Sequence, residues 1–192
     1  GLIMKKKISE LINKSNSILL LTHETPDGDA IGSVLAFYHF LISINKTVDM
    51  VILDIPKIYN FLPGINNIVD SVDREYDLGI VVDCASKDRI GQNNDLFSKC
   101  RNTICVDHHV SNTNYCDINY VEGNVSSCCQ VIYSLFKDLG ITFSIIKFLG
   151  RNLEEVTDLN KYLVFMNKLT LSKYVLMTDE AKNRYFREAV LS

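Results

Sequence analysis

Residues 18–29 read ILLLTHETPDGD, an apolar run that passes directly into a turn containing a proline and a glycine. The run has the length of a buried strand, and the turn after it carries His23, Asp27 and Asp29. The ends of strands are where α/β sheets build their sites, and one imidazole with two carboxylates suits Mn²⁺, Mg²⁺ or Zn²⁺. The alternative is an ordinary turn that caps a following helix.

Two further apolar runs end in the same kinds of side chain. Residues 80–83 read IVVD, and residues 103–109 read TICVDHH. Taken singly, Asp83 has an alternative as a helix cap and His108 as a hydrogen-bonded core histidine. However, three of the four histidines in the chain lie at such strand ends. Because a parallel sheet brings the carboxyl ends of its strands to one edge, the sequence predicts that these groups meet in a metal site.

The order of expected elements predicts an α/β fold, a parallel-sheet sandwich with helices on both faces. The helix that opens at Asp29 directs the positive end of its dipole toward the predicted metal cleft, which favours a phosphate there. The strands are expected at residues 17–22, 47–53, 78–83 and 103–107, and the helices at 5–15, 29–44, 94–100 and 126–139.

The composition fits one α/β domain with a well-buried core. The chain has 192 residues, a net charge of −3 and a pI near 5.8, which argue against broad coating of nucleic acid. No apolar run reaches the ~18 residues of a membrane-spanning helix, so no membrane partner is expected. The six cysteines lack the spacing of a disulfide framework, and no export signal accompanies them. We therefore expect a reducing, cytoplasmic compartment.

The three strand-end segments resemble the motifs of the DHH phosphoesterase superfamily over about residues 17–140. The matching stretches read THETPDGDAIGS at 22–33, VDCAS at 82–86 and VDHHVSN at 106–112. Within the superfamily they most resemble the catalytic domain of bacterial enzymes that act on short oligoribonucleotides and on 3′-phosphoadenosine 5′-phosphate. The resemblance implies hydrolysis of such phosphoesters with two Mn²⁺ ions, for which Mg²⁺ or Co²⁺ could substitute.

The resemblance also implies roles for the motif side chains. Asp107 would orient His108 from behind, and His109 would face the substrate as a general acid or phosphate clamp. Asp83 would bridge the two metal ions. The implied ligands are His23, Asp27 and Asp83 for one ion, and Asp29, Asp83 and His108 for the other.

A fourth motif of the family, usually Asp-Thr-Gly, supplies one more ligand to the second ion, and this chain has no such tripeptide. Asp158, in TDLN at residues 157–160, falls at about the family's separation from His108 and is the favoured candidate. Asp179 is the alternative. The missing glycine, which lets backbone approach a ligand closely, weakens the expected second site.

Beyond about residue 143, apolar residues recur at helical spacing. We expect a DHH metal-binding catalytic domain over residues 4–143 and a helical extension of the same domain over 144–192. The family's second, substrate-gripping domain, with its Gly-Gly-Gly-His signature, is expected to be absent, so hydrolysis by this chain is expected to be weak or lost. The alternative function is a non-catalytic metal- or nucleotide-binding fragment, and an inorganic pyrophosphatase of the same superfamily is less favoured. The resemblance also implies a possible homodimer.

Overall fold

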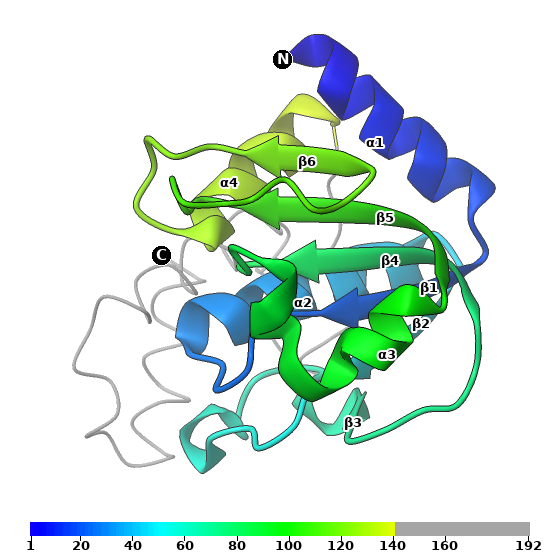
Figure 1. Cartoon of the computed structure of the whole chain (residues 1–192), viewed down its shortest axis with the longest axis vertical. Helices are drawn as coiled ribbons and strands as arrows, with labels where there is room; N and C mark the ends of the chain where they lie inside the picture. Colours follow the sequence, from blue (N-terminus) through cyan, green and yellow to red (C-terminus); the bar gives the residue numbers. More distant parts are fainter. Residues whose placement is uncertain (141–192) are drawn as a thin grey trace, which may run out of the picture.

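A six-stranded, all-parallel sheet forms the centre of the molecule (Figure 1). The computed structural model describes residues 1–140. The strand order is β3-β2-β1-β4-β5-β6. From the central strand β1, the chain adds β2 and β3 on one side, and it then crosses back to add β4, β5 and β6 on the other side. The strands are β1 (Ser17–Leu21), β2 (Thr47–Val51), β3 (Ile68–Val69), β4 (Tyr76–Val82), β5 (Cys100–Asp107) and β6 (Ile118–Val121).

Helices cover both faces of the sheet, as predicted, and Figure 1 shows α3 in front of the sheet and α2 behind it. The first core lies under α1, α2 and α4, and the second lies under α3 and the short 3₁₀ segment η3. Two further 3₁₀ turns, η1 and η2, lie between β2 and β3. The bounds are α1 (Leu2–Lys14), α2 (Gly28–Ser43), η1 (Lys57–Tyr59), η2 (Ile65–Asn67), η3 (Lys87–Asn93), α3 (Asn94–Ser98) and α4 (Cys128–Asp138).

Strand β1 shows why the sheet is buried on both sides. Ile18 and Leu20 belong to the core under α2, whereas Leu19 and Leu21 belong to the core under α3. All four are fully buried. An unbroken apolar run is typical of a parallel strand, because successive side chains point to opposite faces and helices cover both.

Two helices begin at side chains that accept hydrogen bonds from the first turn. Asp27 Oδ1 accepts from Ala30 N (2.9 Å) at the start of α2, and Ser127 Oγ accepts from Gln130 N (3.2 Å) at the start of α4. Such caps satisfy backbone N–H groups that have no partner inside the helix. The helix start predicted near residue 126 therefore lies at the Ser127 cap.

The structure differs from the expected elements mainly at the edges of the sheet. Strands β3 and β6 were not predicted, because β3 has only two residues and Asn119 interrupts the apolar pattern of the half-exposed β6. Strand β5 begins at Cys100, three residues earlier than expected. The expected helical extension, Asp158 and Asp179 lie outside the described residues. The domain boundaries at 143 and 144 therefore stay a prediction.

Candidate metal centre

The sheet brings the three motif segments to one edge. His23 lies two residues after β1, Asp83 directly follows β4, and Asp107 is the last residue of β5. These strands are neighbours, and the strand order reverses between β1 and β4, because β2 and β3 lie on one side of this point and β5 and β6 on the other. Open α/β sheets bind ligands at such a switch point, outside the carboxyl ends of the strands.

Asp83 lies at the centre of this edge. Its side chain is buried, and its Oδ1 atom accepts no hydrogen bond from the described residues. The nearest cationic groups are His23 Nε2, 3.7 Å from Oδ2, and His108 Nε2, 3.4 Å from Oδ1. A buried carboxylate oxygen without a hydrogen bond is costly, and a metal ion would satisfy it.

The backbone of Asp83 is also unusual. Its φ of 53° lies in the left-handed region, which few residues other than glycine adopt. Its N–H still donates to Val106 O (3.1 Å), so the β4–β5 pairing continues up to the turn. The chain thus bends immediately after the last hydrogen bond of the ladder. Strain of this kind collects at functional sites, where the surrounding structure maintains it.

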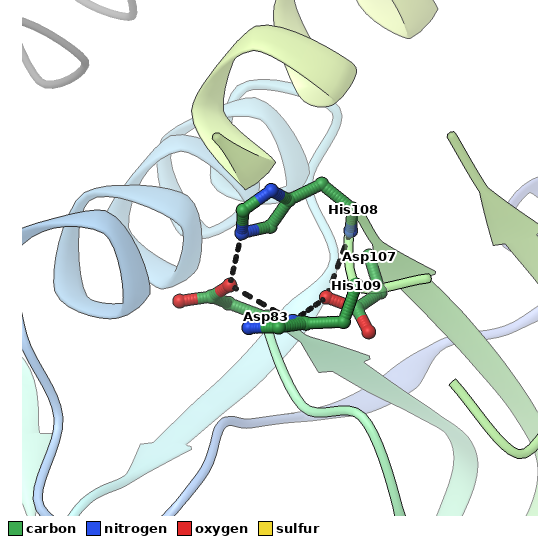
Figure 2. Close-up of side chains that lie close together, drawn as sticks. All are labelled: Asp83, Asp107, His108 and His109. Carbon is green, nitrogen blue, oxygen red and sulfur yellow. Dashed lines mark hydrogen bonds and ion pairs between the residues drawn. The ribbon is translucent and has the colours of Figure 1, made fainter. Parts of the chain in front are cut away.

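Asp107 orients His109, whereas the resemblance implied that it would orient His108. Asp107 Oδ1 accepts from His109 Nδ1 (2.7 Å) and from the backbone N–H of His108 (2.8 Å). Its other oxygen accepts from Asn112 Nδ2 (2.7 Å). The His108 ring instead lies near Asp83 (Figure 2), and its Nδ1 lies 3.4 Å from Val125 O. The imidazole of His108 therefore reaches the metal cleft independently of the Asp107 carboxylate.

Asp29 joins two distant segments at the same edge. It is buried in the first turn of α2, where its two oxygens accept from Cys128 N (2.8 Å) and Cys129 N (2.9 Å) at the start of α4. Its Oδ2 lies 3.7 Å from His108 Nε2. A carboxylate oxygen has two lone pairs, so each oxygen of Asp29 can still accept one more partner.

The charge of Asp83 shifts the pKa values of the groups around it. The nearby carboxylate of Asp83 raises the pKa of His108 to about 9, and it also raises the pKa of His23. Burial raises the pKa of Asp83, but the imidazoles of His108 and His23 beside it outweigh burial and leave the pKa below its ordinary value. Burial raises the pKa of Asp29, and the neighbouring charge of Asp83 adds to this effect. The cleft thus holds excess negative charge next to imidazoles.

Two groups of side chains present ligand atoms close enough to hold metal ions, and Asp83 belongs to both. In each group these atoms all lie within 4.8 Å of one another. The set of imidazole nitrogens and carboxylate oxygens suits a divalent cation such as Mn²⁺ or Mg²⁺. The orphaned Oδ1 of Asp83 fits the same conclusion. The groups are His23, Asp27 and Asp83, and Asp83, Asp107, His108 and His109.

The structure thus brings together six of the predicted site residues in these groups and places Asp29 beside them, while Asp158 lies outside the described residues. Asn112, in the VDHHVSN motif, has a role in the structure that the sequence did not predict. Asn112 Nδ2 holds the second oxygen of Asp107, and its backbone N–H donates to His109 O (3.0 Å). The sequence did contain a signal for this contact, since Asn112 follows Asp107 by five residues in a short polar turn.

The chain has an all-parallel sheet with a cluster of histidines and aspartates at its switch point. These features define an α/β protein with a candidate divalent-metal centre. The model of the DHH family, N-terminal domain, matches residues 17–162. The chain therefore belongs to the DHH family. None of the helices described in residues 1–140 is long and apolar enough to cross a membrane.

Relatives of known name share about a third of their residues with this chain over the matched region. The probable bifunctional oligoribonuclease and PAP phosphatase NrnA of Streptococcus mutans is 31% identical over 129 residues, covering 66% of this chain and 40% of the relative. NrnA of Thermus thermophilus is 30% identical over 130 residues, covering 66% and 38%. NrnA of Bacillus subtilis is 28% identical over 134 residues, covering 69% and 42%. The chain thus spans about two fifths of the length of these relatives.

One solved structure confirms the fold. An exopolyphosphatase-related protein from Bacteroides fragilis superposes with a TM-score of 0.72 at 21% identity, covering all of this chain and 56% of that one. At this level of identity the likeness concerns the fold alone. Together with the family match, it confirms the DHH type of α/β fold predicted from the three strand-end motifs.

Proposed function

We propose that this chain is a divalent-metal-dependent phosphoesterase that hydrolyses short oligoribonucleotides or 3′-phosphoadenosine 5′-phosphate by a two-metal mechanism. The observation that carries the proposal is the pair of ligand groups that share Asp83. Two adjacent ions are a common arrangement in phosphatases and nucleases. The names of the S. mutans, T. thermophilus and B. subtilis relatives support the choice of substrate. A cytoplasmic location belongs to the proposal, because all six cysteines are free.

The proposed ions are Mn²⁺, with Mg²⁺ or Co²⁺ as substitutes. The buried, unsatisfied oxygen of Asp83 supports its role as the bridging ligand. Asp29 keeps a lone pair on each oxygen for a metal, even though it also accepts two backbone hydrogen bonds. In the proposed assignment His23, Asp27 and Asp83 hold one ion, and Asp29, Asp83, His108 and Asp158 hold the other.

Bound divalent cations supply positive charge that activates a water molecule and stabilises the charge developing on a phosphate. The side chains of this protein would orient the other groups. Because His109 Nδ1 donates to Asp107, the imidazole is held in one orientation, and in the imidazolium form Nε2 carries a second proton. From there the proton can pass to the leaving oxygen of the substrate. The N-terminus of α2, which begins beside the cleft, favours a bound phosphate.

Phosphate release from 3′-phosphoadenosine 5′-phosphate, and mononucleotide release from a diribonucleotide, test this proposal with the full chain. We expect turnover with Mn²⁺ and none with a chelator. The His109→Asn variant should lose about 100-fold in turnover, in the range typical of a general acid, while still binding Mn²⁺. Absence of Mn²⁺-dependent hydrolysis of both substrates would contradict the proposal.

A second candidate is a metal- or nucleotide-binding domain without catalysis. Asp29 favours it, because both oxygens of this predicted ligand already accept hydrogen bonds from α4 and the side chain lies outside the two ligand groups. Mn²⁺ binding without hydrolysis would identify this alternative. Two expectations stay predictions: that hydrolysis is weak relative to longer family members, and that two copies of the chain pair.

A further inference from the structure

A pocket of about 500 Å³ opens on the side of His23 that faces β2. It lies between the carboxyl ends of β1 and β2 and is closed on a third side by η3. His23 lines both this pocket and the metal centre, since its Nε2 lies 3.7 Å from Asp83 Oδ2. The volume falls in the range of about 300–1,000 Å³ that is typical of small-molecule sites. A molecule with one group at the metal centre can therefore extend into the pocket.

The exposed part of the pocket floor is apolar. Leu53 and Pro56 are half-buried and line it, whereas Val51, Ile52 and Ile90 are buried and present little surface. Such a surface gains free energy, at roughly 25 cal/mol per Å², when it covers an apolar or aromatic face. The floor therefore suits a flat ring rather than a hydrated ion.

The charge of the lining excludes a second phosphate. Among the residues of the described part, 1–140, that line the pocket there is no lysine or arginine, whereas Glu24 and Asp54 are present. A phosphate placed here would meet two carboxylates without a compensating cation, which is unfavourable. An uncharged group with hydrogen-bonding edges meets no such penalty, and Gln92 and Asn93 offer amide groups for those edges.

The wall formed by η3 is fixed in place by Glu24. Its backbone N–H donates to Arg89 O (2.8 Å), and its Oε1 accepts from Gln92 N (3.2 Å). Gly91 has a φ of 66°, and a Cβ atom there would lie 1.8 Å from Glu24 Oε1. Only glycine permits this close approach. Asn93 Nδ2 donates to Val51 O (3.2 Å), which ties the wall to β2. The pocket is therefore preformed.

We propose that this pocket receives the uncharged base of the nucleotide whose phosphate lies at the metal centre. The inference rests on the proposed function, because the metal centre fixes the position of the phosphate. The described part of the chain would then recognise its substrate by a neutral ring next to the reacting phosphate, and not by a second charged group.

Filling the pocket tests the inference kinetically. In the Leu53→Trp variant the indole would occupy the space of the base, so the KM for a diribonucleotide should rise at least tenfold. Hydrolysis of glycerol phosphate, which has no base, should change less than twofold. The matched control is Ile42→Trp, which places the same side chain on the exposed side of α2. An unchanged KM for the diribonucleotide in a folded Leu53→Trp variant would overturn the inference.

A binding measurement separates this inference from the proposed function. Adenosine carries no phosphate, so its binding to the unmodified chain can be followed by NMR without metal. We expect shifts at the Leu53 methyl groups and the Gln92 amide, and their loss in Leu53→Trp. If the chain hydrolyses no phosphoester, these shifts still support the pocket. If adenosine perturbs neither residue, the pocket assignment is wrong even when hydrolysis is normal.

Discussion

For single residues, the proposed site implies that a proton and a metal ion compete for His108. Its ring must be neutral to bind a metal, but the neighbouring carboxylate of Asp83 raises its pKa to about 9. Below pH 9 the ion must displace this proton, whereas Asp83 is already ionised because its pKa is lowered. We expect the affinity for Mn²⁺ to rise by up to about tenfold per pH unit and to level off near pH 9. Titration against a metal indicator between pH 6.5 and 9 measures this; a flat profile would contradict it.

A second prediction at this scale concerns Asn112. Its amide holds Asp107 Oδ2, so the Asn112→Ala variant leaves the carboxylate that orients His109 less constrained. We expect kcat to fall about 10-fold, with little change in Mn²⁺ affinity, as is typical when a supporting hydrogen bond to a functional group is lost. The exposed Thr113→Ala, in the same turn, is the control. Equal kcat in both variants and the unmodified chain would show that Asn112 does not position His109.

At the scale of elements, Asp29 connects the start of α2 to the start of α4. In Asp29→Ala, two backbone N–H groups of α4 lose their buried acceptor, so the free energy of unfolding should fall by about 2 kcal/mol. The measurement is urea unfolding in the presence of a chelator, so that no metal contributes. The exposed Asp88→Ala provides the control. Identical unfolding midpoints for the two variants would mean that the contact does not support α4.

The elements also show what could be predicted from the sequence. Strands β1, β4 and β5 each carry an apolar run toward their carboxyl end, so both the parallel sheet and the convergence of His23, Asp83 and Asp107 followed from local patterns. The contact between Asp29 and Cys128 spans 99 residues and depends on how two helices pack. The pairing of Asp107 with His109 depends on the shape of the turn after β5. Neither of these two contacts produces a periodic pattern in the sequence, so neither could be predicted from it.

At the scale of the whole molecule, metal binding should stabilise the fold. The proposed ligands follow the ends of three strands that are far apart in the chain, so the unfolded chain cannot assemble them. With free Mn²⁺ at 100 times its dissociation constant, one site adds about 2.7 kcal/mol to the free energy of unfolding. Urea unfolding with Mn²⁺ and with chelator measures the difference. Coinciding midpoints would show that the strand ends do not form a metal site in the folded chain.

In the proposed function, one carboxylate, Asp83, serves both metal ions. The Asp83→Asn variant tests this role, because asparagine has the same shape and tolerates the left-handed φ of 53° but loses the negative charge. Calorimetric titration with Mn²⁺ should give two ions per unmodified chain and at least a 100-fold weaker affinity at both positions in the variant, since each ion loses its shared ligand. Two intact Mn²⁺ sites in the Asp83→Asn variant would show that Asp83 does not bridge two ions.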